Sequence, residues 1–484
     1  MSDYEAVIGL ETHVELTTRS KVFCGCSTEF GAPPNTQVCP VCLGFPGVLP
    51  VLNREVVEYA LRVAIALGSE INSQTIFERK NYYYPDLPKN YQISQKRFPL
   101  GVGGRLDFLV DGELRTINMW EIHIEEDAGK LLHPDDPRAD YSLVDYNRSG
   151  MPLLEMICAP ELHTLQEVEG YMHGLRNLLL YLEVSDCAME KGHLRFEANV
   201  DVRPAGLTGP RPRVEMKNLN SFRAVLRALG YEIDRQTELL RSGGEVIQET
   251  RLWDDARGVT RPMRTKEQAQ DYRYFPEPDL LPLEIDRDWI ERVRASLPEL
   301  PAARRQRYVE QYGLPEYDAA VLTADKGLAD FFERTVQLGA DPKAASNWTM
   351  GSLVRMLKER ELEISQAKVS PDHLARMLAL IDDGTISGKI AKGVFEEMFE
   401  SGASPDDIVR EKGLTQISDT GELGGIVEEV IEANPDVVES YLGGKEKSIG
   451  FLVGQIMKKT GGRANPQMVN QLLRERLEAK KASS

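Results

Sequence analysis

Residues 193–203 read HLRFEANVDVR, and polar and apolar side chains alternate along this stretch without a break. Successive side chains of a β-strand point to opposite faces of its sheet. The segment therefore predicts a strand with one face on a hydrophobic core and one polar face. The polar face would carry His193, Arg195, Glu197, Asn199, Asp201 and Arg203, and the apolar face Leu194, Phe196, Ala198, Val200 and Val202.

Three further segments repeat this alternation with similar polar residues. Their polar faces carry Glu11, His13 and Glu15 in segment 7–16, His123, Glu125 and Asp127 in segment 122–127, and Arg213, Glu215 and Lys217 in segment 213–217. Up to about residue 290, helical spacing is limited to stretches such as 56–67 and 165–182. Because strands and helices do not alternate regularly, the pattern favours an α+β domain with a mostly antiparallel sheet.

After about Asp286 the pattern changes to helical spacing. The apolar stripe of Leu328, Phe331 and Phe332 marks one helix face, and Ser370-Pro371 and Asn465-Pro466 are typical helix starts. Glycines and polar residues around 401–405 indicate a boundary. We predict three domains: an α+β domain over residues 1–290, an all-helical domain over 291–405 and a small helical tail domain over 406–484.

The recurring polar residues of the predicted sheet have two interpretations. One is a solvated face of an ordinary antiparallel sheet. The other is a metal–phosphate site, because clustered carboxylates repel one another unless a cation lies among them, and carboxylates suit Mg²⁺ and its phosphate ligands. Glu125 and Glu126 are adjacent, so both reach one ion only if the strand ends or bulges there. The sequence contains no GxxxxGK[ST] phosphate loop, so a nucleotide site here would be of another kind.

Four of the six cysteines fall close together. Cys24 and Cys26 are separated by one residue, Cys39 and Cys42 by two, and the pairs have 12 residues between them. Four thiolates at such spacing predict a structural zinc site, the alternative being buried free thiols. We expect the two isolated cysteines, Cys158 and Cys187, to be small core residues.

The charge of the chain is unevenly distributed. The net charge of the 484 residues is −18, yet residues 445–484 hold nine Lys and Arg against three Glu, a net of +6, which leaves −24 for the rest. Such a tail either binds phosphates or merely solvates a helix. The start, MSDYEAVIGLE, has no signal-peptide pattern, and no apolar run approaches the roughly 18 residues of a membrane span, so we expect a cytoplasmic protein.

Several long motifs together resemble the B subunits of aspartyl/glutamyl-tRNA amidotransferases. They cover nearly the whole chain in the family's order. They are VIGLETHVE at 7–15, RKNYYYPDLPK at 79–89, YQISQ at 91–95, EEDAGK at 125–130, NRSG at 147–150, KNLNSF at 217–222, DYRYFPEPDL at 271–280, GFLVGQIM at 450–457 and ANP at 464–466.

The resemblance implies a cradle-like catalytic domain followed by helical domains, and a reaction in two steps. ATP and Mg²⁺ phosphorylate the side-chain carboxylate of Glu on tRNA(Gln) or Asp on tRNA(Asn), and ammonia then displaces the phosphate. The ammonia comes from a glutaminase A subunit, and a small C subunit completes the heterotrimer. An acyl phosphate hydrolyses readily, which explains why such chemistry needs a dry pocket.

The resemblance also assigns roles to residues of this chain. The implied magnesium-proximal set is Glu11, His13, Glu125, Glu126 and Glu215. The implied substrate- or phosphate-contacting set is Lys80, Tyr82, Arg195, Asn199 and Lys217, with Lys80, Arg195 and Lys217 on the nucleotide. The four cysteines match the family members that carry a metal knuckle. From the charge split we expect tRNA contacts at Lys458, Lys459, Arg463, Arg474 and Arg476.

The chain departs from the family pattern around residues 191–201. His193 stands where a serine is usual, and Glu197 stands where an aspartate is usual. Glutamate keeps the charge but moves it outward by one methylene, so the roles of these two residues stay open.

Two other function classes compete with this interpretation. A zinc-stapled scaffold that only binds tRNA predicts no ATP hydrolysis that depends on these carboxylates. A small-molecule kinase predicts activity without tRNA. The basic tail disfavours the kinase, and the Glu, His, Asn and Lys face disfavours the scaffold.

Overall fold

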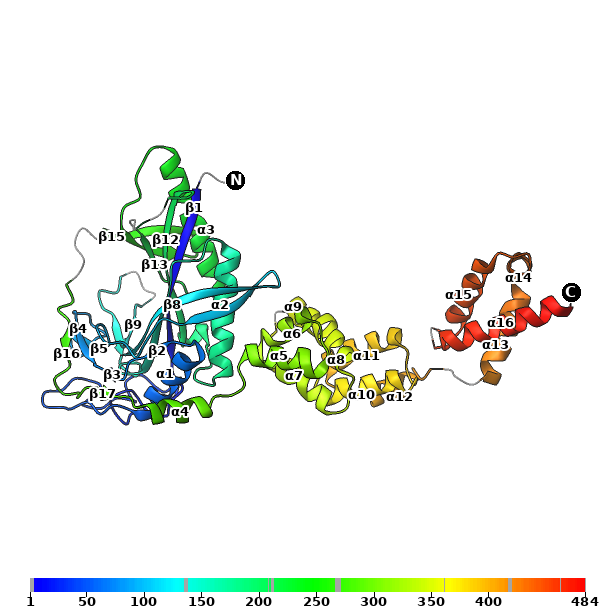
Figure 1. Cartoon of the computed structure of the whole chain (residues 1–484), viewed down its shortest axis with the longest axis horizontal. Coiled ribbons are helices and arrows are strands. Elements are labelled where there is room, and N and C mark those ends of the chain that lie inside the picture. The colour runs from blue at the N-terminus through cyan, green and yellow to red at the C-terminus, as the bar shows by residue number, and fades with distance from the viewer. Residues whose placement is uncertain are drawn as a thin grey trace. The chain divides into compact units, whose positions relative to one another are not determined.

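The computed structural model describes residues 4–134, 138–207, 209, 213–265, 271–360, 362–416, 420–461 and 463–483. The chain divides into two compact units, residues 1–304 and 305–484. All the named strands lie in the first unit, and helices build the second (Figure 1). The expected α+β domain followed by helical structure is thereby confirmed.

A ten-stranded sheet forms the frame of the first unit. All its strand pairs are antiparallel except β13–β14, which is parallel. The strands in spatial order are β15 (Val259–Thr265), β14 (Glu249–Asp254), β13 (Val214–Lys217), β12 (Leu194–Pro204), β1 (Tyr4–Glu15), β11 (Pro152–Cys158), β8 (Glu113–Glu126), β6 (Gly101–Val102) and β2 (Glu70–Ile71), with β7 (Arg105–Val110) also paired to β8.

Three helices cover the apolar face of this sheet. They are α1 (Arg54–Ala66), α2 (Leu165–Tyr181) and α3 (Phe222–Arg241), and their buried residues join those of the central strands in one hydrophobic cluster. Figure 1 shows α2 and α3 side by side against the sheet. Since the helices occupy the apolar face, the polar face is left for a site.

The first two of these helices agree with the helical stretches predicted at 56–67 and 165–182. Helix α3 was not singled out from the sequence. Its inner face includes the buried polar residues Glu232 and Gln236, which interrupt the apolar periodicity, and Glu232 accepts hydrogen bonds from Arg235. Buried polar groups that have partners are tolerated in a core, but they obscure a sequence pattern.

Short strands and one helix complete the first unit. They are β3 (Gln74–Thr75), β4 (Glu78–Asn81), β5 (Tyr91–Ser94), β9 (Lys130–Leu132), β10 (Leu143–Asp145), β16 (Phe275–Pro276), β17 (Leu283–Glu284) and α4 (Arg287–Ala295). Strands β16, β4 and β5 form a small sheet of their own, which carries Lys80.

The second unit contains two separate hydrophobic clusters. The first is built from α5 (Pro301–Tyr312), α6 (Glu316–Thr323), α7 (Lys326–Gln337), α8 (Pro342–Trp348), a π-helical turn (Thr349–Leu353), α9 (Val354–Glu359), α10 (Pro371–Asp382), α11 (Gly388–Ser401) and α12 (Pro405–Lys412). The second is built from α13 (Thr420–Ala433), α14 (Pro435–Leu442), α15 (Ile449–Lys459) and α16 (Pro466–Ser483). The boundaries proposed at residues 290 and 405 stay a prediction.

Both predicted helix starts in this unit are confirmed. Ser370 caps α10 by accepting a hydrogen bond from the backbone N–H of His373, and Pro371 is its first residue. Asn465 accepts from the N–H of Gln467 at 2.9 Å, and α16 begins at Pro466. Among the residues that the structure describes, no helix is both long and apolar enough to span a membrane.

Candidate active site and cysteine cluster

The polar face of the sheet brings the predicted residues into rows that run across the strands. His13 of β1 lies opposite Arg195 of β12 on one side and Glu155 of β11 on the other, and Glu155 in turn lies opposite His123 of β8. Residues paired across strands point to the same face. The next rows place Glu11 beside Glu197, Asn199 beside Glu215, and Glu15 and Glu125 on either side of Leu153.

Three side chains of this face form a compact ligand-like group. One ligand atom from each of His13, Glu125 and Glu155 lies within 4.8 Å of the others, and His13 Nε2 is 3.5 Å from Glu155 Oε1. Hydrogen bonds fix the buried Glu125, whose Oε2 accepts from Gln92 Nε2 at 3.1 Å and whose Oε1 accepts from Ser94 Oγ. Two carboxylates and one imidazole held in this way can take a hard divalent cation such as Mg²⁺.

Electrostatics supports a cation at this group. Burial and the neighbouring Glu125 raise the pKa of Glu155 to about 8. Burial also lowers the pKa of His13, which favours the neutral imidazole that binds metals. A cation among these ligands would relieve the repulsion between the carboxylates.

Glu155 was missed by the sequence analysis. It is the one charged residue of β11, whose sequence is PLLEMIC. A single acidic residue in an otherwise apolar strand is a signal that could have identified it, because an isolated buried carboxylate needs a partner.

Glu11 and Glu215 lie with a lysine rather than with His13. Lys217 Nζ is 2.6 Å from Glu197 Oε2 and 3.1 Å from Glu215 Oε1. Glu11 accepts from Asn199 Nδ2 at 3.0 Å, and burial, Glu197 and Glu215 raise its pKa. Burial opposes the charge of Lys217, but these carboxylates outweigh it and hold the pKa of Lys217 above its usual value.

Four of the five residues of the predicted magnesium-proximal set thus fall into two neighbouring groups, His13 with Glu125 and Glu11 with Glu215. Glu197, whose role was open, is the ion-pair partner of Lys217. It therefore belongs with Glu11 and Glu215.

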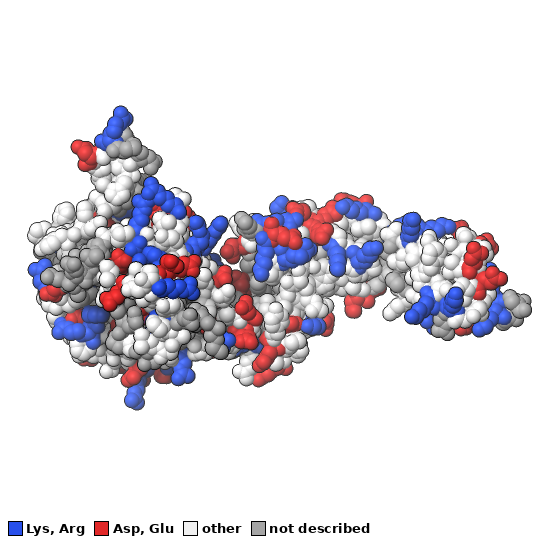
Figure 2. All heavy atoms as spheres, turned by 90° about the horizontal axis from the view of Figure 1, so that it is seen from above, with Lys and Arg blue, Asp and Glu red and all other residues white. Residues whose placement is uncertain are grey.

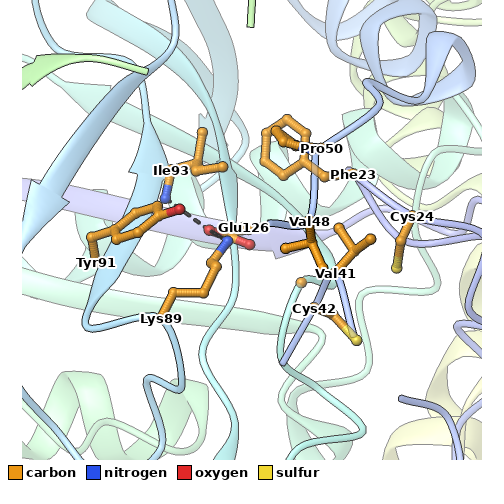
Figure 3. Close-up of a pocket in the computed structure, with 11 residues that line it drawn as sticks. Phe23, Cys24, Val41, Cys42, Val48, Pro50, Lys89, Tyr91, Ile93 and Glu126 are labelled. Carbon is orange, nitrogen blue, oxygen red and sulfur yellow. Dashed lines mark hydrogen bonds and ion pairs between the residues drawn. The ribbon is translucent and has the colours of Figure 1, made fainter. Parts of the chain in front are cut away.

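Glu126 points away from both groups. Its Oε1 accepts a hydrogen bond from the N–H of Ile93 at 2.8 Å and forms an ion pair with Lys89. Figure 3 shows it between Lys89 and the cysteine-bearing loops, in a pocket that Cys24 and Cys42 also line. Strand β8 stays paired to β11 through Glu126, so no bulge turns this side chain toward Glu125.

Lys80 and Tyr82 reach the His13 group from β4 and the segment after it. Lys80 Nζ lies 5.3 Å from the ring centre of Tyr272, whose ring also contacts that of Tyr82. Burial disfavours the charge of Lys80, but Glu125 and Glu155 outweigh burial and raise its pKa. Burial raises the pKa of Tyr82, so its hydroxyl stays protonated at neutral pH.

An ion-pair cluster around the buried Asp127 borders this group. Arg195 Nη2 donates to Asp127 Oδ2 at 2.7 Å, and Arg148 Nε lies 3.5 Å from the same oxygen. Burial alone would raise the pKa of Asp127, yet the two arginines hold it below its usual value. His193, which departs from the family pattern, contacts Asp186 through Nδ1 at 2.7 Å and so lies at the margin of the site.

An open pocket of about 510 Å³ continues the polar face. It is lined by Gly9, Leu10, Glu11, Lys96, Trp120, Glu121, Ile157, Cys158, Asn199 and Arg213. Two basic residues and one half-exposed aromatic ring, that of Trp120, lie beside Glu11. This combination suits a ligand with an aromatic part and an anionic part.

The four clustered cysteines come together as predicted. One sulfur from each of Cys24, Cys26, Cys39 and Cys42 lies within 4.8 Å of the others, and the Sγ atoms of Cys39 and Cys42 are 3.9 Å apart. Tetrahedral zinc with Zn–S bonds of about 2.3 Å requires S–S distances of about 3.8 Å, so the cluster fits this metal. Cys158 and Cys187 are buried core residues, as expected.

The predicted tRNA-binding residues lie on α15, α16 and the segment between them. All five, namely Lys458, Lys459, Arg463, Arg474 and Arg476, are exposed. Lys459 pairs with Glu429, and Arg476 with Glu428 at 3.2 Å. Figure 2 shows that lysines and arginines share the surface of these tail helices with acidic side chains.

The fold and the site define a class: an α+β enzyme whose active face is lined with buried ionisable groups, joined to helical domains. A family model described as the GatB/GatE catalytic domain matches residues 6–291, and one described as the GatB domain matches residues 330–477. The chain belongs to the family of aspartyl/glutamyl-tRNA(Asn/Gln) amidotransferase B subunits.

Full-length relatives agree. The B subunit of this amidotransferase from Moorella thermoacetica is 60% identical over 98% of this chain and 100% of its own length. That from Carboxydothermus hydrogenoformans is 57% identical over 99% of each chain. That from Brevibacillus brevis is 53% identical over 98% of this chain and 99% of the relative.

Proposed function

We propose that this chain performs the amidation half of a tRNA-dependent amidotransferase reaction. It activates the side-chain carboxylate of Glu on tRNA(Gln) or Asp on tRNA(Asn) with ATP and then replaces the activated oxygen with ammonia. The observation that carries the proposal is the group of His13, Glu155 and the buried Glu125, with the charged Lys80 beside it.

The two chemical steps balance as follows. A carboxylate oxygen of the substrate attacks the γ-phosphorus of ATP, the bond to ADP breaks, and an acyl phosphate forms. Ammonia then attacks the carbonyl carbon, inorganic phosphate leaves, and the nitrogen loses a proton. The activation is needed because a carboxylate oxygen is a poor leaving group.

The chain's own residues have distinct roles in this proposal. His13, Glu125 and Glu155 would hold Mg²⁺, which neutralises phosphate charge when bound. Lys80 supplies a positive charge next to the reacting carboxylate, and the protonated Tyr82 donates a hydrogen bond there. Lys217 contributes charge to the phosphates, while Arg195, already paired with Asp127, keeps that wall of the site in position.

ATP would occupy the pocket beside Glu11. Trp120 offers an aromatic face for the base, and Lys96 and Arg213 offer cations for phosphates. Asn199 links that pocket to the Lys217 group, because it lines the pocket and lies opposite Glu215, an ion-pair partner of Lys217, on the neighbouring strand.

Ammonia and substrate come from partners in this proposal. The sequence shows no recognisable Ser/Lys or Cys/His nucleophile arrangement for glutamine hydrolysis, so a glutaminase A subunit would supply ammonia. A small C subunit would complete a heterotrimer. Misacylated tRNA would contact the tail through Lys458, Lys459, Arg463, Arg474 and Arg476, and the four cysteines would hold one structural Zn²⁺.

The test is amidation by the assembled heterotrimer with either glutamine or ammonium chloride as the nitrogen donor. His13→Ala and Glu126→Ala should abolish both reactions and leave glutamine hydrolysis measurable. His13 is tested as a cation ligand, and Glu126 as the partner of Lys89 behind the site. Full ammonia-dependent activity in the His13 variant would exclude the proposed site.

The same assay distinguishes the proposed catalytic function from the alternative of a tRNA-binding scaffold. If this chain only docks tRNA, ATP hydrolysis should be insensitive to the His13 substitution. The burial of Glu125 at 3% exposure disfavours that alternative, because a docking surface gains nothing from carboxylates removed from solvent.

A further inference from the structure

Lys21 is a fully buried lysine beside the cysteine cluster. Its relative exposure is 0%, and it is among the largest fully buried side chains of the chain. Its ammonium contacts the carbonyl oxygens of Gln37 at 2.8 Å and Tyr146 at 3.5 Å, and the Sγ of Cys42 at 3.8 Å. Among the described residues, no carboxylate lies within ion-pair distance of it.

A buried ammonium without an opposite charge is costly. Lysine is almost never fully buried unless it is paired, and carbonyl dipoles replace only part of the lost hydration. Among the described residues that the ammonium of Lys21 contacts, Cys42 of the cysteine cluster is the one that can carry negative charge. Zinc bound by four thiolates has a formal net charge of −2, so it provides what the ammonium lacks.

We propose that Lys21 is the charge partner of the zinc–tetrathiolate cluster and that its ammonium, bonded to Cys42, raises the affinity of the cluster for zinc. The proposal rests on the assignment of zinc to the four cysteines and is independent of the amidation chemistry. Lys21 ligates no metal itself. It acts as a positioning residue that compensates the charge of the ligand set.

The same lysine connects the cluster to the active-site wall. Gln37 belongs to the loop between the cysteine pairs, and its N–H donates to Asn147 Oδ1 at 2.9 Å. Tyr146 precedes the turn at Gly150, whose N–H bonds the carbonyl of Asp127 at 2.9 Å. Lys21 therefore holds together the loop that binds the metal and the turn that supports Asp127.

The first measurement is zinc release from the full-length chain within the heterotrimer. Excess chelator is added, and the released metal is measured with a metallochromic indicator. Lys21→Met should weaken zinc binding by about 10- to 100-fold, the range for loss of a partner of a metal ligand. Lys21→Arg, which keeps the charge, should lose less.

A matched control is available in Lys191→Met. Lys191 lies 5.6 Å from the ring of Phe30, a residue of the same loop, yet its side chain is 40% exposed and pairs with Asp186. It touches no cysteine, so its substitution should leave zinc release unchanged. Equal zinc release from Lys21→Met and Lys191→Met would overturn the proposal.

The second measurement separates charge compensation from simple packing. The melting temperatures of wild type and Lys21→Met are compared with zinc bound and after chelation. The lysine charge is needed only when the cluster is negatively charged, so the substitution should lower the melting temperature more with zinc than without it. An equal loss in both states, or an insoluble variant in both, would make Lys21 a packing residue and refute the proposal.

The failure of the underlying assignment has a different signature. If wild-type protein contains no zinc after purification, the assignment of zinc to the four cysteines is itself refuted. If wild type contains zinc and the Lys21→Met variant releases zinc no faster than wild type, only the proposed role of Lys21 is refuted.

Discussion

Replacing Glu155 by Gln tests the candidate magnesium group most directly. Glutamine keeps the volume and removes the charge of a residue whose Oε1 is 3.5 Å from His13 Nε2. Because the ionised Glu155 is disfavoured in the metal-free site, the substitution should leave the free protein as stable as wild type or more stable. The substitution should weaken only the binding of Mg²⁺.

The geometry and the pKa of about 8 bear on the size of that loss. Mg²⁺ carries two charges, so it attracts a carboxylate about 4 Å away by about 8 kcal/mol at an effective dielectric constant of about 20. Removing the proton from Glu155 at pH 7 costs about 1.4 kcal/mol of this, because its pKa lies roughly one unit above that pH. Dehydration of the two ions offsets much of the rest. Loss of even a partner of a metal ligand weakens metal binding by about 10- to 100-fold, so we expect loss of the ligand charge to weaken Mg²⁺ binding by about 100-fold.

The assay is ammonia-dependent amidation by the proposed heterotrimer over a Mg²⁺ titration, which bypasses glutamine hydrolysis. Glu155→Gln should shift the half-saturating Mg²⁺ concentration upward by about two orders of magnitude. The matched control is Glu5→Gln, on the same strand as His13 but paired with Arg203 at the other end of β1. A Glu155 variant with the Mg²⁺ requirement of the control would refute the reasoning.

Three further predictions concern the rest of the chain. Freshly purified protein should contain one Zn²⁺ per chain, and metal removal should lower its melting temperature while part of the amidation activity survives; metal analysis without zinc would contradict this. Deleting residues 406–484 should raise KM for misacylated tRNA. It should also reduce the slope of log affinity against log salt concentration by about one unit per lost phosphate contact. Glutaminase activity is the control, and an unchanged KM with an unchanged slope would show that the tail does not bind tRNA. The pKa of Asp127 is held below that of an unfolded chain by Arg195 and Arg148, so its stabilising contribution is present above about pH 4 and is lost as the pH falls through its lowered pKa. Asp127→Asn should therefore narrow the difference in melting temperature between pH 6 and pH 3, and a difference as wide as that of wild type would argue against it.

The sequence alone determined four of the strands, the two faces of each, and the helical character of the second half of the chain. The alternation over residues 193–203 identified the two faces of β12, because side-chain direction in a strand depends only on position along it. The cysteine spacing predicted the cluster, and Ser370-Pro371 predicted the start of α10, because these are local features. The long motifs identified the family.

Only the tertiary structure decided which polar residues become neighbours. Period-two alternation assigns a face but not an adjacent strand, and register across strands is set by the whole sheet. That register brings Glu155 of β11 to His13, although the two are far apart in sequence. The same register pairs Glu197 with Lys217. Because strand β8 stays regularly paired with β11 up to Glu126, the carboxylate of Glu126 points toward Lys89 and the cysteines. Lys21 shows the same limit, since burial of a charged side chain depends on the packing of distant segments, which no local pattern in the sequence specifies.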